Sequence, residues 1–178
     1  MHNFNAEEAM AIEGYSEPWE LEWLFNHADC MDSYLEIGCY FGRTACAVSS
    51  SSCRLIYTVD HFKGSITDPS DPTGEVAKEI DIYEQAQKNL QNHNVEIINK
   101  SSIEASRMFA PDSIDMVFID GAHDSFSCLT DIMAWYPKTR HLFCGHDRDW
   151  PGVQNALISF GIPYELGPGS IWYLKIRR

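Results

Sequence analysis

The chain has 178 residues and a net charge of −13, because its 26 aspartate and glutamate residues outnumber its 13 lysine and arginine residues. This length suits a single domain, residues 1–178, and the hydrophobic content of 44% is that of a globular protein rather than a disordered or coiled-coil chain. The acidic balance opposes binding to nucleic acid or to an anionic membrane surface. No stretch approaches the ~18 consecutive apolar residues of a membrane span, and no basic, apolar leader is present, so we expect a cytoplasmic protein.

The cysteines indicate no disulfide scaffold. Six cysteines are few for this length, and none of them forms a C-x-x-C pair. Three of them recur seven residues apart, but the segment that holds them crosses from a strand end into a helix and out again, which does not suit a metal site. We expect buried free thiols at all six positions: Cys30, Cys39, Cys46, Cys53, Cys128 and Cys144.

Strand and helix patterns alternate along the chain. Short apolar runs predict strands at 33–38, 54–60, 94–99, 114–120, 140–145, 162–166 and 171–176. Helical spacing or helix-start residues predict helices at 16–28, 43–50, 75–92, 102–110, 124–136 and 151–160. This alternation is typical of an α/β, doubly wound sheet of seven strands, mostly parallel, with an antiparallel last strand pair and helices on both faces. Residues 64–74 form the one long loop rich in glycine and proline.

The first predicted strand runs into a turn bracketed by two glycines, Gly38 and Gly42. Glycines at this place let the backbone approach a ligand closely, and ligands of such sheets bind outside the carboxyl ends of the strands. Tyr40 stands where a dinucleotide fingerprint needs its second glycine, which disfavours NAD or FAD. Asp60 closes the next strand, about 20 residues later, where a carboxylate can accept both hydroxyls of a ribose. The turn and Asp60 together predict a ligand that contains a nucleoside.

A second group of polar residues follows the fourth and fifth predicted strands. Asp120 ends the fourth, and His146 and Asp147 end the fifth, so all three should protrude at the same rim as the nucleoside site. Two carboxylates and one imidazole suit Mg²⁺ or another hard or borderline divalent cation. His123 follows Asp120 by three residues and has a side chain suited to taking a hydroxyl proton, although it can equally cap the following helix.

Four motifs taken together resemble the class I S-adenosylmethionine (SAM)-dependent methyltransferases, whose fold is Rossmann-like. They are residues 36–44 (Glu-Ile-Gly-Cys-Tyr-Phe-Gly-Arg-Thr), 59–62 (Val-Asp-His-Phe), 118–123 (Phe-Ile-Asp-Gly-Ala-His) and 144–147 (Cys-Gly-His-Asp). The last two narrow the resemblance to small O-methyltransferases with Asp-Gly-x-His and Gly-His-Asp motifs, similar to the macrocin and catechol O-methyltransferases. The resemblance implies transfer of a methyl group from SAM to an oxygen of a small molecule, such as a sugar or a hydroxylated metabolite.

The resemblance also implies residue roles. Glu36 and Gly38 would lie under the methionine part of SAM, and Asp60 would hold its ribose. The residues expected around the rest of the cofactor are Tyr40, Gly42, His61, Phe62, Ser101, Ser102 and Asp120, with His61 or Phe62 flanking the adenine and both serines lining the adenine side. His123 would be the general base, and Asp120, His146 and Asp147 the metal ligands. His146 departs from the pattern, since the family usually has a carboxylate there.

Two other functions fit part of the sequence. A metal-dependent phosphoesterase would use the polar residues after the fourth and fifth strands, but would leave Glu36, the glycine turn and Asp60 without a role. A cofactor-binding protein that has lost catalysis is the other alternative. The covers expected for the site are Trp150, the 64–74 loop and residues 13–15. So little chain lies outside the sheet and helices that we expect a small, exposed acceptor or a pocket completed by a second copy of the chain in a homodimer.

Four further tryptophans have the spacing of helix or strand core faces, and we expect them to be packed in the interior: Trp19, Trp23, Trp135 and Trp172.

Overall fold

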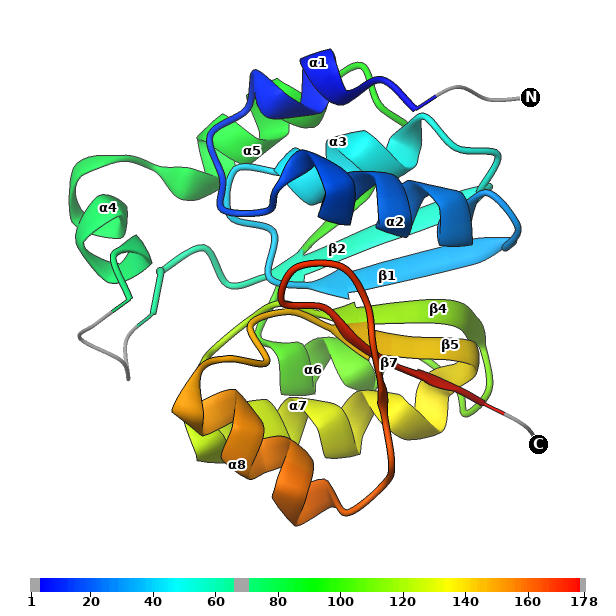
Figure 1. The fold of residues 1–178 in the computed structure, drawn as a ribbon. Coiled ribbons are helices and arrows are strands. Elements are labelled where there is room, and N and C mark those ends of the chain that lie inside the picture. Colours follow the sequence, from blue (N-terminus) through cyan, green and yellow to red (C-terminus); the bar gives the residue numbers. More distant parts are fainter. Residues whose placement is uncertain (1–3, 66–70, 177–178) are drawn as a thin grey trace.

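The computed structural model describes residues 4–65 and 71–176, which fold around one twisted sheet (Figure 1). The sheet has seven strands in the order β3-β2-β1-β4-β5-β7-β6. Their bounds are β1 Ser33–Ile37, β2 Leu55–Asp60, β3 Glu96–Asn99, β4 Ile114–Ile119, β5 Thr139–Gly145, β6 Glu165–Leu166 and β7 Trp172–Lys175. The order turns back at β1, so the carboxyl ends of β1 and β4 flank the point where the winding reverses.

The strand directions confirm the predicted fold class. β1 pairs in parallel with β2 and β4, while β7 runs antiparallel to both β5 and β6. β1 and β4 are buried along their whole length, as expected of central strands covered on both faces. β6 is only two residues long, shorter than the predicted 162–166, and Pro163 within that stretch has no backbone N–H to donate to a neighbouring strand.

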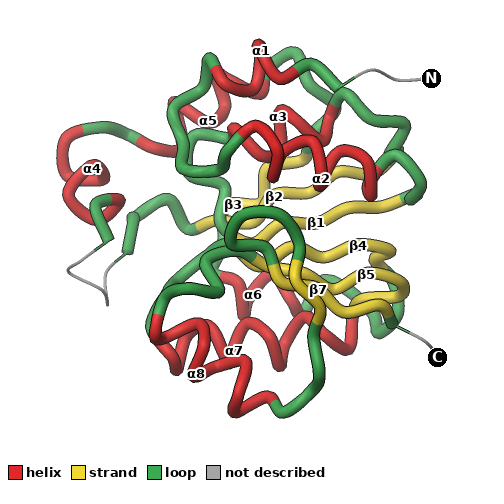
Figure 2. Tube along the Cα trace, viewed as in Figure 1, coloured by secondary structure: helices red, strands yellow, loops and turns green. Residues whose placement is uncertain are grey.

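Two helical layers cover the sheet. The helices are α1 Ala6–Met10, α2 Pro18–Ala28, α3 Arg43–Ser49, α4 Thr73–Glu79, α5 Ile82–Leu90, α6 Ser102–Ser106, α7 Ser125–Trp135 and α8 Pro151–Phe160, with a short 3₁₀ helix at Tyr136–Lys138. Figures 1 and 2 show α1, α2, α3 and α5 on one face and α6, α7 and α8 on the other, with α4 standing apart from both layers. None of the described helices is long and apolar enough to span a membrane.

Several helix boundaries differ from the predictions, and for α2 and α5 a polar side chain at the helix start explains the difference. The predicted helix 75–92 is two helices, because Ile80 is extended and Asp81 caps α5 by accepting a hydrogen bond from the backbone N–H of Glu84. α2 begins after Glu17 rather than Ser16. α6 ends at Ser106, well before the predicted residue 110, and α1 is a short helix that the pattern did not predict.

Two expectations about packing are wrong. Trp19 is 54% exposed rather than buried, because it lies on the outer side of the first turn of α2. Cys30 is also exposed, whereas the other five cysteines are buried free thiols as expected. Trp135 and Trp172 are fully buried, and they are among the largest side chains of the core.

Candidate functional site

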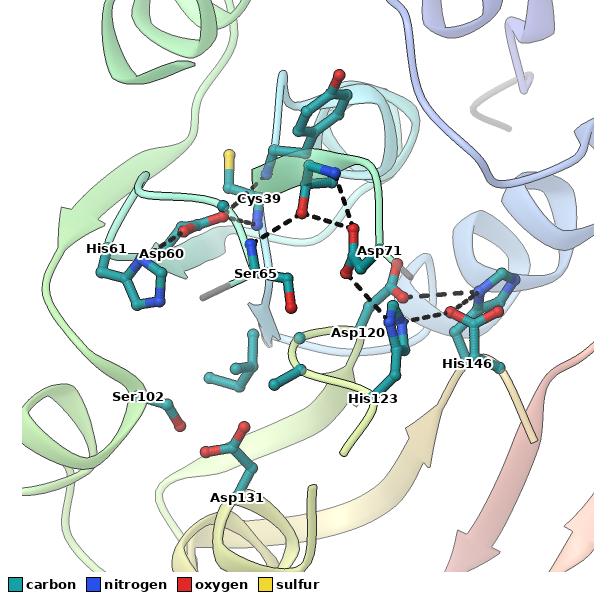
Figure 3. Close-up of a pocket in the computed structure, with 18 of the residues that line it drawn as sticks. Cys39, Asp60, His61, Ser65, Asp71, Ser102, Asp120, His123, Asp131 and His146 are labelled. Carbon is teal, nitrogen blue, oxygen red and sulfur yellow. Dashed lines mark hydrogen bonds and ion pairs between the residues drawn. The ribbon is translucent and has the colours of Figure 1, made fainter. Parts of the chain in front are cut away.

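A cavity of about 620 Å³ opens at the carboxyl ends of the central strands (Figure 3). Most of the predicted site residues line it: Gly38, Tyr40, Asp60, His61, Phe62, Ser101, Ser102, Asp120, His123, His146 and Asp147. Glu36 and Gly42 do not line it. The structure therefore brings eleven of the thirteen predicted residues to one cavity, whose volume suits a ligand of nucleoside size.

The glycine turn after β1 is shaped by backbone that only glycine adopts easily. Gly38 has a φ of +94°, and a Cβ at this position would overlap the carbonyl oxygen of Asp120. Gly42 has a φ of +90°, and its Cβ would come within 2.8 Å of the Leu90 side chain. The role of Gly42 is thus to let the turn pack against α5, while Gly38 lets the turn approach the end of β4.

Asp60 holds this turn from the neighbouring strand. Its Oδ2 accepts hydrogen bonds from the backbone N–H groups of Cys39 (2.9 Å) and Tyr40 (3.0 Å), and its Oδ1 accepts one from that of Phe62 (2.7 Å). Oδ1 therefore has one backbone donor and retains capacity to accept a further bond. A ligand hydroxyl at Asp60 would meet a carboxylate that the protein backbone has already oriented.

Glu36, at the start of the 36–44 motif, does not line the cavity. It is fully buried, and its carboxyl oxygens accept hydrogen bonds from Tyr34 Oη (3.0 Å) and Thr58 Oγ1 (2.9 Å). Burial raises the pKa of Glu36 to about 8, although both hydroxyls act in the opposite direction. The side chain is thus largely uncharged near neutral pH, and it links β1 to β2 through Thr58.

Two histidines and several carboxylates form a connected cluster at one end of the cavity (Figure 3). Nε2 of His123 lies 2.8 Å from Asp147 Oδ2, and its Nδ1 lies 3.2 Å from Asp71 Oδ2. Nδ1 of His146 lies 3.3 Å from the same Asp147 oxygen and 3.6 Å from Asp120 Oδ1. His123 therefore has a carboxylate at each ring nitrogen, and Asp147 contacts both histidine rings.

Charge pairing dominates the titration of this cluster. Burial alone would lower the pKa values of the two histidines, but the surrounding carboxylates raise that of His123 to about 10 and that of His146 to about 11. Burial raises the pKa of Asp120 to about 6, whereas the two histidines hold the pKa of Asp147 well below its ordinary value despite its burial. Without a further cation, both imidazoles are protonated near neutral pH.

The His146 side of the cluster suits a divalent cation. The ligating atoms of Asp120, His146 and Asp147 all lie within 4.8 Å of one another. Oε1 of Glu20 lies 3.0 Å from His146 Nε2, and Glu20 is itself fixed by a hydrogen bond from the backbone N–H of Ser170 (2.9 Å). A carboxylate behind the ligating imidazole is the usual arrangement around metal-bound histidine, because it orients the ring.

Several ring nitrogens of these histidines lack well-directed hydrogen bonds. His123 Nδ1 and Nε2 and His146 Nε2 are buried, and their neighbouring carboxylate oxygens lie at ion-pair distance but off the N–H directions. Buried polar atoms without a hydrogen-bond partner are uncommon in native proteins, and a bound ion or water often explains them. The His146 nitrogen that lies near Asp120 and Asp147 is Nδ1, which is not one of these three atoms. The fit to a divalent cation therefore rests on the donor set of two carboxylates and one imidazole at Asp120, His146 and Asp147.

The opposite end of the cavity is less charged. In Figure 3 Ser102 and Asp131 lie together, away from His123 and His146. Asp131 comes from α7, and its side chain is 7% exposed. Phe62 also lines the cavity and packs its ring against Tyr83 of α5, with centroids 4.9 Å apart.

The three segments expected to cover the site all contribute residues to the cavity wall. Arg43 holds residues 12–16 in place, because its Nε donates to the carbonyl of Ile12 (2.7 Å) and its Nη1 donates to that of Ser16 (3.0 Å). The ring of Trp150 stacks on His123 with centroids 4.4 Å apart. Of the 64–74 loop, residues 66–70 lie outside the described residues, but Asp71 contacts His123 and both Gly64 and Ser65 line the cavity.

Comparison with known protein families decides the class of this site. A family described as a methyltransferase domain matches residues 35–141, which is more than half of the chain. The chain belongs to this methyltransferase family. The matched region of the methyltransferase domain includes the glycine turn, Asp60, Asp120 and His123, whereas His146 and Asp147 lie beyond its end.

Solved structures share the fold of this methyltransferase domain. A SAM-dependent O-methyltransferase from Thermotoga maritima has a TM-score of 0.65 at 13% identity, covering 97% of this chain and 72% of that one. An O-methyltransferase from Bacillus cereus in complex with S-adenosylhomocysteine (SAH) has a TM-score of 0.63 at 14% identity, covering 97% and 90%. An SAH-bound methyltransferase from Podospora anserina has a TM-score of 0.64 at 14% identity, covering 97% and 86%.

One curated protein shares a short stretch of sequence. The pentafunctional AROM polypeptide of Eremothecium gossypii is 32% identical over 56 residues, which are 32% of this chain and 4% of that protein. The methyltransferase domain therefore spans only a small fraction of the length of this relative.

Two acidic residues of the cavity, Asp71 and Asp131, and one that contacts His146 from outside it, Glu20, were not predicted. Glu20 belongs to a capping box at the start of α2, so its sequence pattern indicated a helix start rather than a site. Asp71 lies in a loop with no regular pattern, and Asp131 lies on the inward face of α7 among apolar residues. Of the three, only Asp131 could have been found from the sequence, because an acidic residue at a core position of a helix is itself a sign of a functional role.

Proposed function

We propose that this domain transfers a methyl group from SAM to an oxygen of a small hydroxylated molecule. The observation that carries the proposal is the cavity bounded by the Gly38 turn and Asp60, within a chain of the methyltransferase family. Three similar folds whose names specify O-methyl transfer or bound SAH support the cofactor and the acceptor atom. The family match also favours methyl transfer over the phosphoesterase alternative.

In this proposal SAM spans the cavity from the carboxylate cluster to Ser102. Its methionine part lies along the Gly38 turn above Glu36, and a ribose hydroxyl donates to Oδ1 of Asp60. The adenine ring lies between Phe62 or His61 and the serines that follow β3, Ser101 and Ser102. The carboxylates of the cluster favour the positively charged sulfonium over the neutral thioether of the product.

Asp120, His146 and Asp147 would hold a divalent cation, with Glu20 orienting the His146 ring. When bound, such an ion lowers the pKa of a coordinated acceptor hydroxyl. All three residues line the cavity, and their ligating atoms lie within 4.8 Å of one another, so an acceptor oxygen in the cavity could reach an ion held there. Their position next to the Gly38 turn allows that oxygen to approach the methyl carbon opposite the sulfur, which in-line transfer requires.

In this proposal His123 is the proton acceptor. The carboxylates of Asp71 and Asp147 raise the pKa of His123 to about 10, so only a small fraction of the imidazole is neutral near neutral pH. The neutral imidazole would take up the hydroxyl proton as the oxygen attacks the methyl carbon, and the imidazolium that forms is stabilised by the Asp147 carboxylate. Trp150 stacks on the ring and keeps it in place.

The function is tested by calorimetric titration of SAH into the purified chain, with and without Mn²⁺. We expect saturable binding of SAH, and a rise in the unfolding temperature that grows with SAH concentration. NADH and a phosphate monoester serve as competing ligands and should not bind. Absence of SAH binding would contradict the proposal, and hydrolysis of the monoester in a chain that ignores SAH would establish the phosphoesterase instead.

A further inference from the structure

A second group of metal-binding side chains lies outside the cavity, where three segments of the chain meet. Glu8 comes from α1, Cys46 from α3 and His93 from the turn after α5, all on one side of the sheet (Figure 1). A carboxylate oxygen, the thiol sulfur and an imidazole nitrogen lie within 4.8 Å of one another. None of the three residues lines the cavity, so the methyl transfer proposed above does not use them.

Ser49 fixes which nitrogen of His93 faces the other two side chains. The Ser49 hydroxyl donates its single hydrogen to the carbonyl oxygen of Cys46 (2.7 Å), so it can only accept in its contact with Nδ1 of His93 (2.7 Å). Nδ1 therefore carries a hydrogen, and in the neutral ring Nε2 keeps its lone pair. Nε2 is the atom that faces Cys46 and Glu8. Metal-bound histidines usually donate from their other ring nitrogen in this way, which fixes the tautomer and the ring orientation.

The distances within the group suit one shared ion. Nε2 of His93 lies 3.5 Å from Glu8 Oε1, longer than the about 2.7–3.2 Å of an N–H···O hydrogen bond, and 3.7 Å from Cys46 Sγ. In a tetrahedral Zn²⁺ site, the bond lengths place a nitrogen and an oxygen ligand about 3.4 Å apart, and a nitrogen and a sulfur ligand about 3.6 Å apart. Both observed distances are close to these values, so an ion could enter with little movement of the side chains.

The group is sheltered but reachable from solvent. Cys46 is 3% exposed and the His93 side chain 14%, whereas the Glu8 side chain is 57% exposed. Glu8 therefore gives an ion a path from solvent, and water can occupy a fourth coordination position. Sulfur, imidazole and carboxylate ligands together suit Zn²⁺, whereas Mg²⁺ and Mn²⁺ prefer oxygen. This donor set thus differs from that of the cavity, whose candidate ion site contains no sulfur.

We propose that Glu8, Cys46 and His93 form a zinc site that joins α1 to α3 and to the turn after α5. When the ion binds, the thiol releases its proton to solvent, and the ion is held by the thiolate sulfur, Nε2 of His93 and a Glu8 carboxylate oxygen. Ser49 is the positioning residue that orients the imidazole. Since residues 13–16 follow α1 closely and line the cavity, the ion would also anchor the chain just before this cover.

The purified chain is titrated with Co²⁺ under reducing conditions, because Co²⁺ enters zinc sites and its bond to a thiolate gives a charge-transfer absorption in the near ultraviolet. Ligation by oxygen and nitrogen alone, as at Asp120, His146 and Asp147, does not give this band. We expect the band to saturate at one ion per chain and to disappear when excess Zn²⁺ is added. A chain that binds Co²⁺ without a thiolate band, or does not bind it, would overturn the proposal.

Two cysteine variants assign the band to a thiol. Cys46→Ser should abolish it, whereas Cys30→Ser, at the one exposed cysteine, should retain it. Loss of the band in Cys30→Ser with retention in Cys46→Ser would place the ion on a surface thiol and overturn the proposal.

Glu8→Gln changes an exposed side chain and keeps the test decisive if Cys46→Ser does not fold. It should weaken Co²⁺ binding by about 10-fold or more, since losing a ligand costs at least as much as losing a residue that supports one. Glu7→Gln, exposed on the same helix, is the matched control and should bind as the wild type does. Equal affinities in the two variants would exclude Glu8 as a ligand and overturn the proposed site.

Ser49→Ala removes the orienting hydrogen bond and leaves all three ligands in place. We expect the band to persist while the affinity for Co²⁺ falls by about 10-fold or more. Ser50→Ala is the matched control, because the Ser50 hydroxyl also donates to the carbonyl three residues earlier, that of Ala47 (2.7 Å), and Ser50 is not part of the group. Its affinity should equal that of the wild type. Equal affinities in the two serine variants would overturn the assignment of Nε2 as the bound nitrogen.

Discussion

Oε1 of Glu20 lies 3.0 Å from Nε2 of His146, although Glu20 belongs to α2 and His146 directly follows β5. Both side chains are almost fully buried, and Glu20 is held in turn by backbone N–H groups of Glu17 and Ser170. The His146 ring is therefore oriented from behind by a carboxylate that does not itself face the ion site formed with Asp120 and Asp147.

Glu20→Gln should weaken binding of divalent cations by about 10-fold or more, because a neutral amide supports the ligating imidazole less well than a carboxylate. Titration of Mn²⁺ into the ligand-free chain by calorimetry measures this directly. Glu22→Gln, on the exposed side of the same helix, is the control and should bind as the wild type does. Equal Mn²⁺ affinities in the two variants would exclude the orienting role.

Asp60→Ala should weaken SAH binding and also destabilise the glycine turn, because three backbone N–H groups lose their acceptor. We expect the free energy of unfolding to fall by about 1–3 kcal/mol in chemical denaturation. The ribose contact is separated from this effect by comparing SAH with its 2′-deoxy and 3′-deoxy analogues. The wild type should lose affinity for at least one of them, and Asp60→Ala should bind all three alike. A wild type that is indifferent to both deoxy analogues would rule out the ribose contact.

Glu36→Gln should change how stability depends on pH. The folded-state pKa of Glu36 is raised to about 8 from an ordinary value of 4.5, so its favourable contribution is complete below pH 4.5 and is lost as the pH rises through about 8. Between these limits the wild type should lose about 1.4 kcal/mol per pH unit relative to the variant. Urea denaturation at a series of pH values measures the difference, and parallel pH profiles would contradict the buried, protonated state.

Gly38→Ala should destabilise the domain by more than about 3 kcal/mol, because the added Cβ would overlap the Asp120 carbonyl in a backbone conformation that already strains alanine. Gly161→Ala is the matched control. Its φ of +72° is similarly left-handed, but the nearest atom to its Cβ, the carbonyl oxygen of Ile158, is 4.0 Å away. The control should lose only about 1 kcal/mol. Equal losses in denaturation experiments would contradict the prediction, because they would mean that the backbone shifts to remove the overlap with the Asp120 carbonyl.

Much of the fold follows from local sequence patterns. The central strands are continuous apolar runs, and the carboxyl ends of parallel strands meet at one edge, which is why Asp60, Asp120, His146 and Asp147 could be predicted to converge. The break at Ile80 was missed because the apolar spacing continues across it, although the Asp81 cap was visible in the sequence.

The contacts that complete the site were beyond local patterns. Glu20 reaches His146, and Asp71 reaches His123, only because distant segments are brought together by the tertiary fold. The same holds for Asp60, whose carboxylate was expected to face a ribose and is also engaged by the backbone of the turn. Sequence spacing predicts which residues lie at the same edge of the sheet. It does not predict which hydrogen-bond donors each carboxylate will contact.

The hydrogen bonds from the Cys39 and Tyr40 amides to Asp60 have a consequence for the kinetics of ligand binding. The turn loses its conformational entropy when the chain folds, so ligand binding does not have to order it again. Association at this part of the molecule should therefore resemble docking to a rigid surface, with an on-rate governed by diffusion and orientation and with differences among related ligands expressed in how slowly they leave.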